Sequence, residues 1–260
     1  MRNIEVKVLN PQAITEARRM AGCAARLTQH GHNIKSLDDF MEVYNKPVSD
    51  KFMGSLMDLP HPTLQKFEKI NVVVVGASRR FLAQITRHQN EVKFMSASLQ
   101  YSDYSGEADF TIPYELLEKP ELKNKYLRNC QNAMSDYMEL VNAGVNNDTA
   151  GYEAPQGLRN VLIISATPYQ FKHMISQRVC RRNTAETRYV MLRIWEQLYD
   201  LDPIFFKCGP FCMFGPCKEG KMCCGTPLKA EMTPIEILAE DFPLLMRNTK
   251  IKENDSYEII

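Results

Sequence analysis

Residues 87–105, RHQNEVKFMSASLQYSDYS, place an arginine and a histidine ahead of a run of hydroxyl-bearing side chains. Arginine grips phosphate through a fixed fork of donors, and serine, glutamine and tyrosine side chains can add hydrogen bonds to phosphate or to the edge of a base. This stretch therefore favours a nucleotide as its ligand. The same small polar residues also fill turns for local reasons, so the spacing alone leaves a purely structural loop as the alternative.

Further arginines occur where predicted elements begin or end. Arg87 ends a predicted helix, Arg159 begins a predicted strand, and a late helix carries Arg178, Arg181, Arg182 and Arg188. Spacings of three and four residues place Arg178, Arg181, Arg182 and Glu186 on one helical face. The guanidinium of Arg178 is a candidate to hydrogen-bond a planar ring edge. A snorkelling Arg178 paired with Glu186 is the alternative.

Length and composition fit a globular protein whose net charge is close to zero. The chain has 260 residues with 44% hydrophobic content, and we expect a single unit spanning 1–260 with a polar tail at 248–260. Lysine and arginine total 32 against 31 acidic residues, which argues against nucleic acid or an anionic membrane as partner. The first ten residues lack a signal-peptide pattern, and the longest aliphatic run, at 70–75, is too short to span a bilayer. We expect a cytoplasmic protein.

A cysteine-rich loop, CGPFCMFGPCKEGKMCCG at 208–225, is the main candidate for a metal site. Four thiolates at these separations could bind zinc, from Cys208, Cys212, Cys217 and Cys223. Because the paired C-x-x-C spacing of zinc knuckles is missing, we expect reduced structural thiols and no metal, with zinc as the alternative. Neither G-x-G-x-x-G nor a P-loop occurs, so side chains must hold any nucleotide.

Periodicity and turn signals outline the elements. Strands are predicted at 4–8, at 70–75 with a stop at Gly76, at 108–112 and at 158–168. Helices are predicted at 11–27, 36–43 with Ser36 as cap, 50–57, 78–87, 113–143 and 169–200, the last as one long helix or a closely spaced pair. The stretch after Arg87 is predicted to be an ordered loop, and 144–157 a second loop.

Several segments, in order along the chain, resemble the flavin-dependent thymidylate synthases. AARLTQHGH is similar to an early segment of that family, with Thr28 where serine is usual, and the region from 61 to 88 resembles the family's G-H-x-S and S-R-x4-Q-x2-R-H-R motifs. The opening stretch resembles the signature that starts R-H-R and closes S-x-R-Y. PQGLRNVLI and FKHMISQRVCRRNTAETR resemble two later motifs, and the cysteine loop is similar to a tail of some bacterial members.

This resemblance implies a fold and an activity. The fold is α/β (α+β), with a central, mostly antiparallel sheet flanked by helices, as in the thymidylate synthase complementing proteins. The implied enzyme is a homotetramer that shares FAD between subunits and methylates dUMP at C5 to give dTMP. Methylenetetrahydrofolate supplies the carbon and NADPH the reducing equivalents.

The resemblance also assigns residues to the site. Arg178 is the implied catalytic residue, holding the uracil edge and favouring its N3-ionised form. The implied dUMP ligands are Gln84, Arg87, Ser98, Gln100, Arg159 and Arg178. The implied FAD ligands are Thr28, Thr63, Arg87, His88, Gln89, Ser96 and His173.

Three departures fall inside the signature itself. Gln89 replaces the third residue of R-H-R, Ser96 stands at the acidic position, and Gln100 replaces the arginine before Tyr101, with one residue inserted after His88. Losing an arginine from a phosphate site removes a charge-assisted hydrogen bond worth about 1.5–3 kcal/mol. Two alternatives therefore stand beside the main hypothesis. One is a related flavin-dependent C5 transferase acting on another pyrimidine nucleotide, and the other is a non-catalytic nucleotide- or zinc-binding protein.

Overall fold

The computed structural model describes residues 1, 4–102, 104, 106 and 108–246. Its strands are β1 (Glu5–Val8), β2 (Ile70–Ser78), β3 (Val92–Ser96) and β4 (Arg159–Ala166). Its α-helices are α1 (Gln12–His30), α2 (Leu37–Asn45), α3 (Asp50–Met57), α4 (Arg79–Ile85), α5 (Pro120–Asn142), α6 (Asn147–Ala150), α7 (Pro168–Arg178), α8 (Ala185–Leu201), α9 (Pro234–Asp241) and α10 (Pro243–Met246). The polar tail predicted at 248–260 lies outside the described residues.

The four strands form one sheet in the order β1-β2-β4-β3, and every neighbouring pair is antiparallel. This confirms the predicted α+β class with an antiparallel sheet. The two central strands, β2 and β4, are paired from Ile70 opposite Ala166 to Ser78 opposite Arg159. The last residues of β2 and the first residues of β4 therefore lie at the same end of the sheet.

Three predictions about the strands need correction. Gly76 does not stop β2, because its positive φ of 83° allows a bulge between Val75 and Ala77, after which pairing continues. Residues 92–96 were expected in a loop but form β3, paired with β4. The strand predicted at 108–112 is reduced to a single bridge between Phe110 and Leu158.

The helical predictions agree more closely with the structure. Ser36 caps α2 as expected, in a capping box with Asp39. The region 169–200 is a closely spaced pair, α7 and α8, rather than one helix. Within 113–143, helix α5 begins at Pro120 after the short 3-10 turn Tyr114–Leu116. The loop predicted at 144–157 contains the short helix α6.

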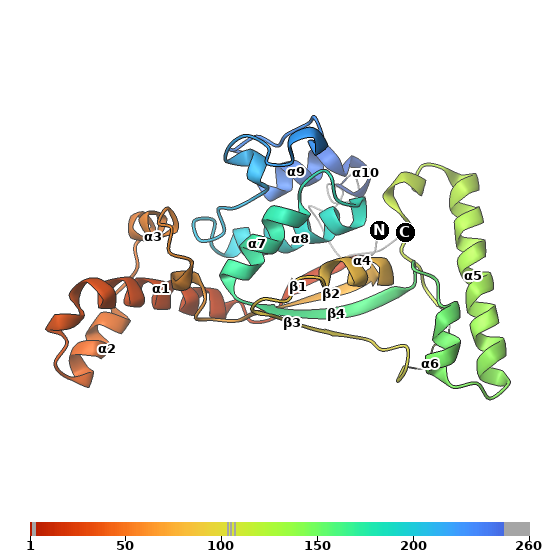
Figure 1. Ribbon diagram of the computed structural model, residues 1–260, viewed down its shortest axis with the longest axis horizontal. Helices are drawn as coiled ribbons and strands as arrows, with labels where there is room; N and C mark the ends of the chain where they lie inside the picture. Colours follow the sequence, from red (N-terminus) through yellow and green to blue (C-terminus); the bar gives the residue numbers. More distant parts are fainter. Residues whose placement is uncertain (2–3, 103, 105, 107, 247–260) are drawn as a thin grey trace, which may run out of the picture.

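Helices α4, α7 and α8 lie on one face of the sheet, as Figure 1 shows. Helix α8 is buried on most sides, because its residues pack against β1 and β2, against α7 and against α9. Its Trp195 is 1% exposed and donates its indole N–H to the carbonyl of Phe206 at 3.0 Å. The main core thus lies between α8 and the inner face of the sheet.

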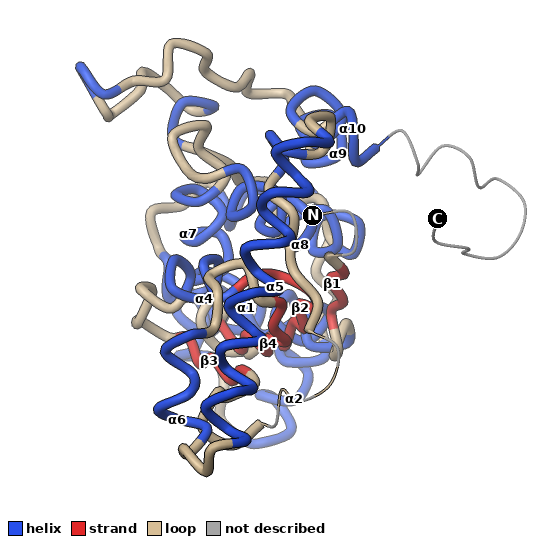
Figure 2. The backbone as a smooth tube through the Cα atoms, turned by 90° about the vertical axis from the view of Figure 1, so that its right-hand side faces the viewer, coloured by secondary structure: helices blue, strands red, loops and turns tan. Residues whose placement is uncertain are grey.

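A second, smaller core lies at one end of the sheet, where α5 and α6 stand apart from the other helices in Figure 1 and lie toward the viewer in Figure 2. Its buried members are Phe110, Cys130, Met134, Tyr137, Ala150 and Leu158. The α5–α6 pair is therefore attached through the ends of β2 and β4 rather than through the main core. Across the described ranges, no helix is both long enough and apolar enough to cross a membrane.

The middle of the outer face of the sheet is apolar and exposed, between polar residues such as Lys7 and Lys93. Met95 is 72% exposed, and it lies opposite Ile163, which in turn lies opposite Val73. Val161 and Ile163 of β4 are 45% and 41% exposed. Isolated exposed apolar side chains are ordinary, but a contiguous apolar patch on a sheet indicates an interaction surface.

The carboxylate of Glu186 joins α8 to Ser78, the residue before α4. Glu186 Oε1 accepts from the backbone N–H of Ser78 at 2.7 Å, and its Oε2 accepts from the Ser78 hydroxyl at 2.6 Å. Ser78 is 3% exposed and also caps α4 by accepting from the Phe81 N–H. This contact sets the direction in which α4 leaves the sheet.

Replacing Glu186 with alanine is expected to lower the free energy of unfolding by about 2–3 kcal/mol, because a buried backbone N–H loses a charged acceptor. The matched control is Glu139→Ala on the exposed side of α5, for which a change within about 0.5 kcal/mol is expected. Urea denaturation measures both variants. Equal effects of the two substitutions would contradict a stabilising role for the contact between Glu186 and Ser78.

Candidate functional site

Arg178, the last residue of α7, lies against His88, which follows α4. The Nε–H of Arg178 donates to Nε2 of His88 at 2.8 Å. His88 is only 7% exposed. Burial first, and then the like charge of Arg87, lower the pKa of Arg178. The charges of Arg87 and Arg178 therefore repel each other, and an anion bound nearby would relieve this repulsion.

His173 and Gln177 complete this region from the same helix as Arg178. The His173 ring stands edge-on to His88, with ring centroids 6.0 Å apart, and its Nε2 is 3.0 Å from Nε2 of Gln177. Four of the predicted site residues, Arg87, His88, His173 and Arg178, are thus brought together. Gln177 was not among the predicted residues, although its position four residues after His173 could have indicated it. We refer to Arg87, His88, His173 and Arg178 as the α4–α7 cluster.

The buried ring of His88 is uncharged at neutral pH. Burial, followed by the charges of Arg178 and His173, lowers the pKa of His88 to about 4. Because Nε2 accepts a hydrogen bond from Arg178, the single ring proton must lie on Nδ1. His88 is therefore a neutral acceptor that orients the guanidinium without cancelling its charge.

Local sequence explains where α7 starts. The residue before α7 also helps to hold the loop between α4 and β3. Thr167 caps α7 by accepting from the Gln170 N–H, and Pro168 occupies the first turn. The Thr167 hydroxyl in turn contacts Glu91 Oε2 at 3.0 Å. Glu91 has a left-handed φ of 55° and also accepts from Lys66 at 2.8 Å. Sequence reasoning missed Glu91, which anchors the loop that carries Arg87 and His88.

Four other predicted residues lie on neighbouring segments. Thr28 is on the last turns of α1, and its hydroxyl donates to the Ala25 carbonyl at 2.9 Å. Thr63 is on a 3-10 turn, Pro62–Gln65, that packs against both α1 and α7. Gln84 is half-buried on α4, and Gln89 is exposed just after it. Thr63 therefore lies on a segment next to α7, and Gln84 and Gln89 lie on or just after α4, whereas Thr28 lies at the far end of α1.

A second group of predicted residues, Arg159, Ser96, Ser98 and Gln100, lies at the end of the sheet where β4 begins and β3 ends. Arg159 forms an ion pair with Asp109 and lines a separate cavity of about 210 Å³. The Asn160 side chain donates to the Ala97 carbonyl at 3.3 Å, which holds the segment from Ser96 to Ser98 near the same end. The Ser98 hydroxyl accepts from the Gln100 N–H, and Gln100 is exposed. Within one chain, Arg159 and Arg178 line different cavities.

The prediction that Arg178, Arg181, Arg182 and Glu186 share one helical face is wrong. Helix α7 ends at Arg178, because Asn183 folds back and its amide donates to the Gln177 and Cys180 carbonyls. The turn at 179–184 breaks the helical spacing. Glu186 binds Ser78, so the alternative pairing of Arg178 with Glu186 is also wrong.

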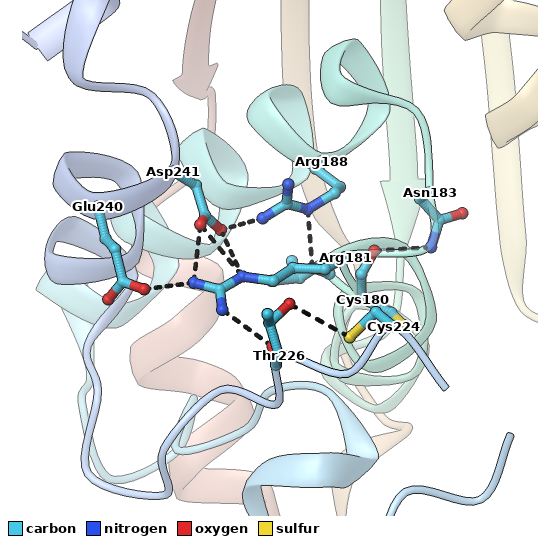
Figure 3. A network of polar contacts seen from close by, with 9 residues as sticks. Cys180, Arg181, Asn183, Arg188, Cys224, Thr226, Glu240 and Asp241 are labelled. Carbon is cyan, nitrogen blue, oxygen red and sulfur yellow. Dashed lines mark hydrogen bonds and ion pairs between the residues drawn. The ribbon is translucent and has the colours of Figure 1, made fainter. Parts of the chain in front are cut away.

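Instead, Arg181 belongs to a buried network with α9 (Figure 3). Its guanidinium donates to Asp241 at 2.8 Å, to Glu240 at 2.6 Å and to the Thr226 carbonyl at 2.9 Å. Asp241 also pairs with Arg188 of α8, and its side chain is only 10% exposed. One carboxylate therefore holds two arginines and fastens the turn after Arg178 to α9.

The cysteine loop provides no metal centre in the part of the chain that the structure describes. No group of three or more His, Cys, Asp or Glu residues there is arranged to hold a metal ion. Cys208, Cys212, Cys217 and Cys223, the four cysteines of the alternative zinc site, are not gathered into such a group among the described residues. Cys208 is buried, and burial raises its pKa to about 12.

Comparison with known proteins gives consistent matches. The model of the family described as thymidylate synthase complementing protein matches residues 12–204. A flavin-dependent thymidylate synthase of Geobacter sulfurreducens is 24% identical over 191 residues, 73% of this chain and 82% of the relative. One of Pyrococcus furiosus is 26% identical over 193 residues, 71% and 78% of the two chains.

A solved structure is also similar in fold. It is the crystal structure of a UMP/dUMP methylase, PolB from Streptomyces cacaoi, bound with 5-Br dUMP. The TM-score is 0.60 at 16% sequence identity, covering 79% of this chain and 93% of the other. At that identity the likeness concerns the fold.

The low pKa of His88 predicts a loss of stability in mild acid. The unfolded chain binds this proton near pH 6.5, whereas the folded chain binds it only near pH 4. Unfolding therefore takes up a proton between these values, and the free energy of unfolding falls as the pH falls through the window. Urea titrations at several pH values should show a steeper fall for the wild type than for His88→Gln, which keeps an acceptor but does not titrate. Parallel slopes would contradict the assignment.

Proposed function

Because the chain belongs to the thymidylate synthase complementing protein family, we propose that it is a flavin-dependent thymidylate synthase. In this proposal it transfers a one-carbon unit from methylenetetrahydrofolate to C5 of dUMP and reduces it to give dTMP. The observation that carries the proposal is the α4–α7 cluster, where Arg87 and Arg178 converge beside the neutral ring of His88.

The chemistry of these side chains suits a nucleotide. The Nε of Arg178 is engaged by His88, and among the described residues its two terminal amino groups have no protein hydrogen-bond partner. They remain available to a planar ring edge. A cation at this position would favour the N3-ionised uracil and raise the electron density at C5. An anionic ligand would also relieve the mutual repulsion between Arg178 and Arg87 that lowers the pKa of Arg178.

Residues of this cluster, together with residues on other segments, form the set of donors that we propose for FAD as the cofactor. Hydroxyl, imidazole and guanidinium donors without acidic side chains suit its pyrophosphate and ring edges, and we assign this role to Thr28, Thr63, Arg87, His88, Gln89, Ser96 and His173. When bound, FAD would carry reducing equivalents from NADPH to the one-carbon unit. The protein's part is to bind, orient and exclude water.

A homotetramer is part of the proposal, and two observations support it. Arg159 and Arg178 line different cavities of one chain, so a site that uses both requires a second subunit. The outer face of the sheet carries exposed Met95, Val161 and Ile163, an apolar patch suited to burial against another copy. We propose that FAD sites are shared between subunits.

A second candidate acts on another pyrimidine nucleotide. It is favoured by Gln89, Ser96 and Gln100, where the family signature carries charged residues, and the similar structure is named as a UMP/dUMP methylase. Fewer charges around a phosphate change which nucleotide is held best.

Turnover distinguishes these candidates. The purified protein is expected to show flavin absorbance and to release tritium from C5-labelled dUMP when NADPH, FAD and methylenetetrahydrofolate are present. Labelled UMP and dCMP are assayed in parallel. Release from UMP or dCMP but not from dUMP would favour the second candidate. A colourless protein without turnover, after supplementation with FAD, would support a non-catalytic binding protein.

Mixed oligomers test whether two subunits build one site. Arg178→Ala and Arg159→Ala are each expected to abolish turnover, and Arg178→Ala should retain its FAD absorbance. When the two variants are co-expressed, sites that take Arg159 from one chain and Arg178 from the other regain both residues. About a quarter of wild-type activity is then expected from random assembly of a symmetric oligomer. Absence of any recovery in verified mixed oligomers would contradict a shared site.

A further inference from the structure

A cavity of about 450 Å³ lies between the turn after α7 and the segment that follows residue 210. Five of the eight cysteines line it, namely Cys180, Cys212, Cys217, Cys223 and Cys224. All five are partly exposed, whereas Cys23, Cys130 and Cys208 are buried. The cavity thus concentrates the thiols that a small reagent can reach, and the proposed reaction uses none of them.

A tight chain reversal brings two of these thiols together. Gly220 has a left-handed φ of 52°, and its carbonyl accepts from the Cys223 N–H at 3.1 Å. The Met222 N–H likewise donates to the Glu219 carbonyl at 2.9 Å. The thiols of Cys217 and Cys223, on either side of Gly220, line the same cavity and lie close enough to influence each other's charge.

The two thiols differ in their surroundings. The backbone N–H of Gly225 donates to Sγ of Cys223 at 3.4 Å. For Cys217, the backbone N–H of Glu219 lowers the pKa, but the contact with Cys223, burial and the neighbouring Cys212 together raise it. Because the raised pKa of Cys217 disfavours its thiolate, Cys217 is suited to act after Cys223.

The charges around the cavity favour small anionic disulfides. Arg178, Arg181, Arg182 and Lys218 line it, against Glu219 as the acidic residue. Arg181 is already paired with Asp241 and Glu240, so Arg178, Arg182 and Lys218 are the main cationic groups for a bound carboxylate. Lys218 is fixed by its ammonium group, which lies 4.7 Å from the ring centroid of Phe211.

We propose that Cys217 and Cys223 form a reversible thiol modification site that reacts with low-molecular-weight disulfides such as oxidised glutathione. The Cys223 thiolate attacks one sulfur of the reagent, the reagent's S–S bond breaks, and one glutathione leaves as a thiolate that takes up a proton. Cys217, on losing its proton, then attacks Sγ of Cys223 and releases the second glutathione. The two protein thiols are oxidised to one disulfide, and the reagent is reduced to two thiols.

Trypsin makes this pair easy to detect, because Lys218 and Lys221 lie between the two cysteines. The fully reduced full-length protein is treated with oxidised glutathione, remaining thiols are alkylated, and the protein is digested. We expect the loss of two of the eight alkylatable thiols and a cross-linked pair of peptides, 208–218 with 222–229. The cross-link should disappear after reduction with dithiothreitol. The readout needs no turnover, so it is independent of the proposed catalytic function.

Matched variants identify the sulfurs. Cys217→Ser and Cys223→Ser should each abolish the cross-link, whereas Cys212→Ser and Cys224→Ser, in the same two peptides, should retain it. Melting curves confirm that the variants remain folded. Persistence of the cross-link without Cys217 or Cys223 would overturn the proposal, as would a dominant Cys180–Cys224 pair. Two further results would also overturn it: no thiol loss in the wild type, or bound zinc that must be removed before the thiols react.

Discussion

The hydrogen bond from Arg178 to His88 joins the two helices whose ends form the candidate site. It requires an uncharged imidazole, and burial supplies this by lowering the pKa of His88 to about 4. A charged histidine would repel the guanidinium and lose its acceptor nitrogen. The geometry of the site therefore depends on the burial of the His88 ring, since that burial excludes water from it.

The position of Arg178 is supported from its other side by residues outside the segment that matches the family model. That match ends at residue 204, whereas Asp241 and Glu240 belong to α9. Asp241 binds Arg181 and Arg188, so the turn following Arg178 is fastened both to α8 and to α9. Removing one partner of such a buried group leaves uncompensated charge, which makes the network strongly interdependent.

The sheet has one covered and one uncovered face, and this asymmetry bears on assembly. Val72, Val74, Leu162 and Ile164 point into the core, while their neighbours Val73, Val161 and Ile163 point outward with apolar side chains. A strand that is aliphatic on both faces is typical of a sheet covered on both sides. The run at 70–75 thus agrees with a second subunit covering the outer face and, with it, with a site built from residues of two chains.

Local signals in the sequence were sufficient for most elements. Ser36 with Asp39 predicted the start of α2, and the β-branched run predicted β2, because caps and side-chain alternation act over a few residues. The family motifs likewise indicated Arg87, His88, His173 and Arg178. These features depend on residue type and short spacing, which a single sequence displays directly.

Tertiary contacts decided the rest. Residues 92–96 became β3 because β4, far along the chain, supplies their hydrogen bonds, whereas 108–112 found only one bridging partner. The end of α7 at Arg178 depends on the fold-back of Asn183 and on Asp241 of α9, so the expected arginine face did not form. Likewise, only three-dimensional packing shows that His88 is uncharged, that Glu91 anchors the loop and that Arg159 lines a different cavity from Arg178, because burial and charge proximity arise between segments distant in sequence.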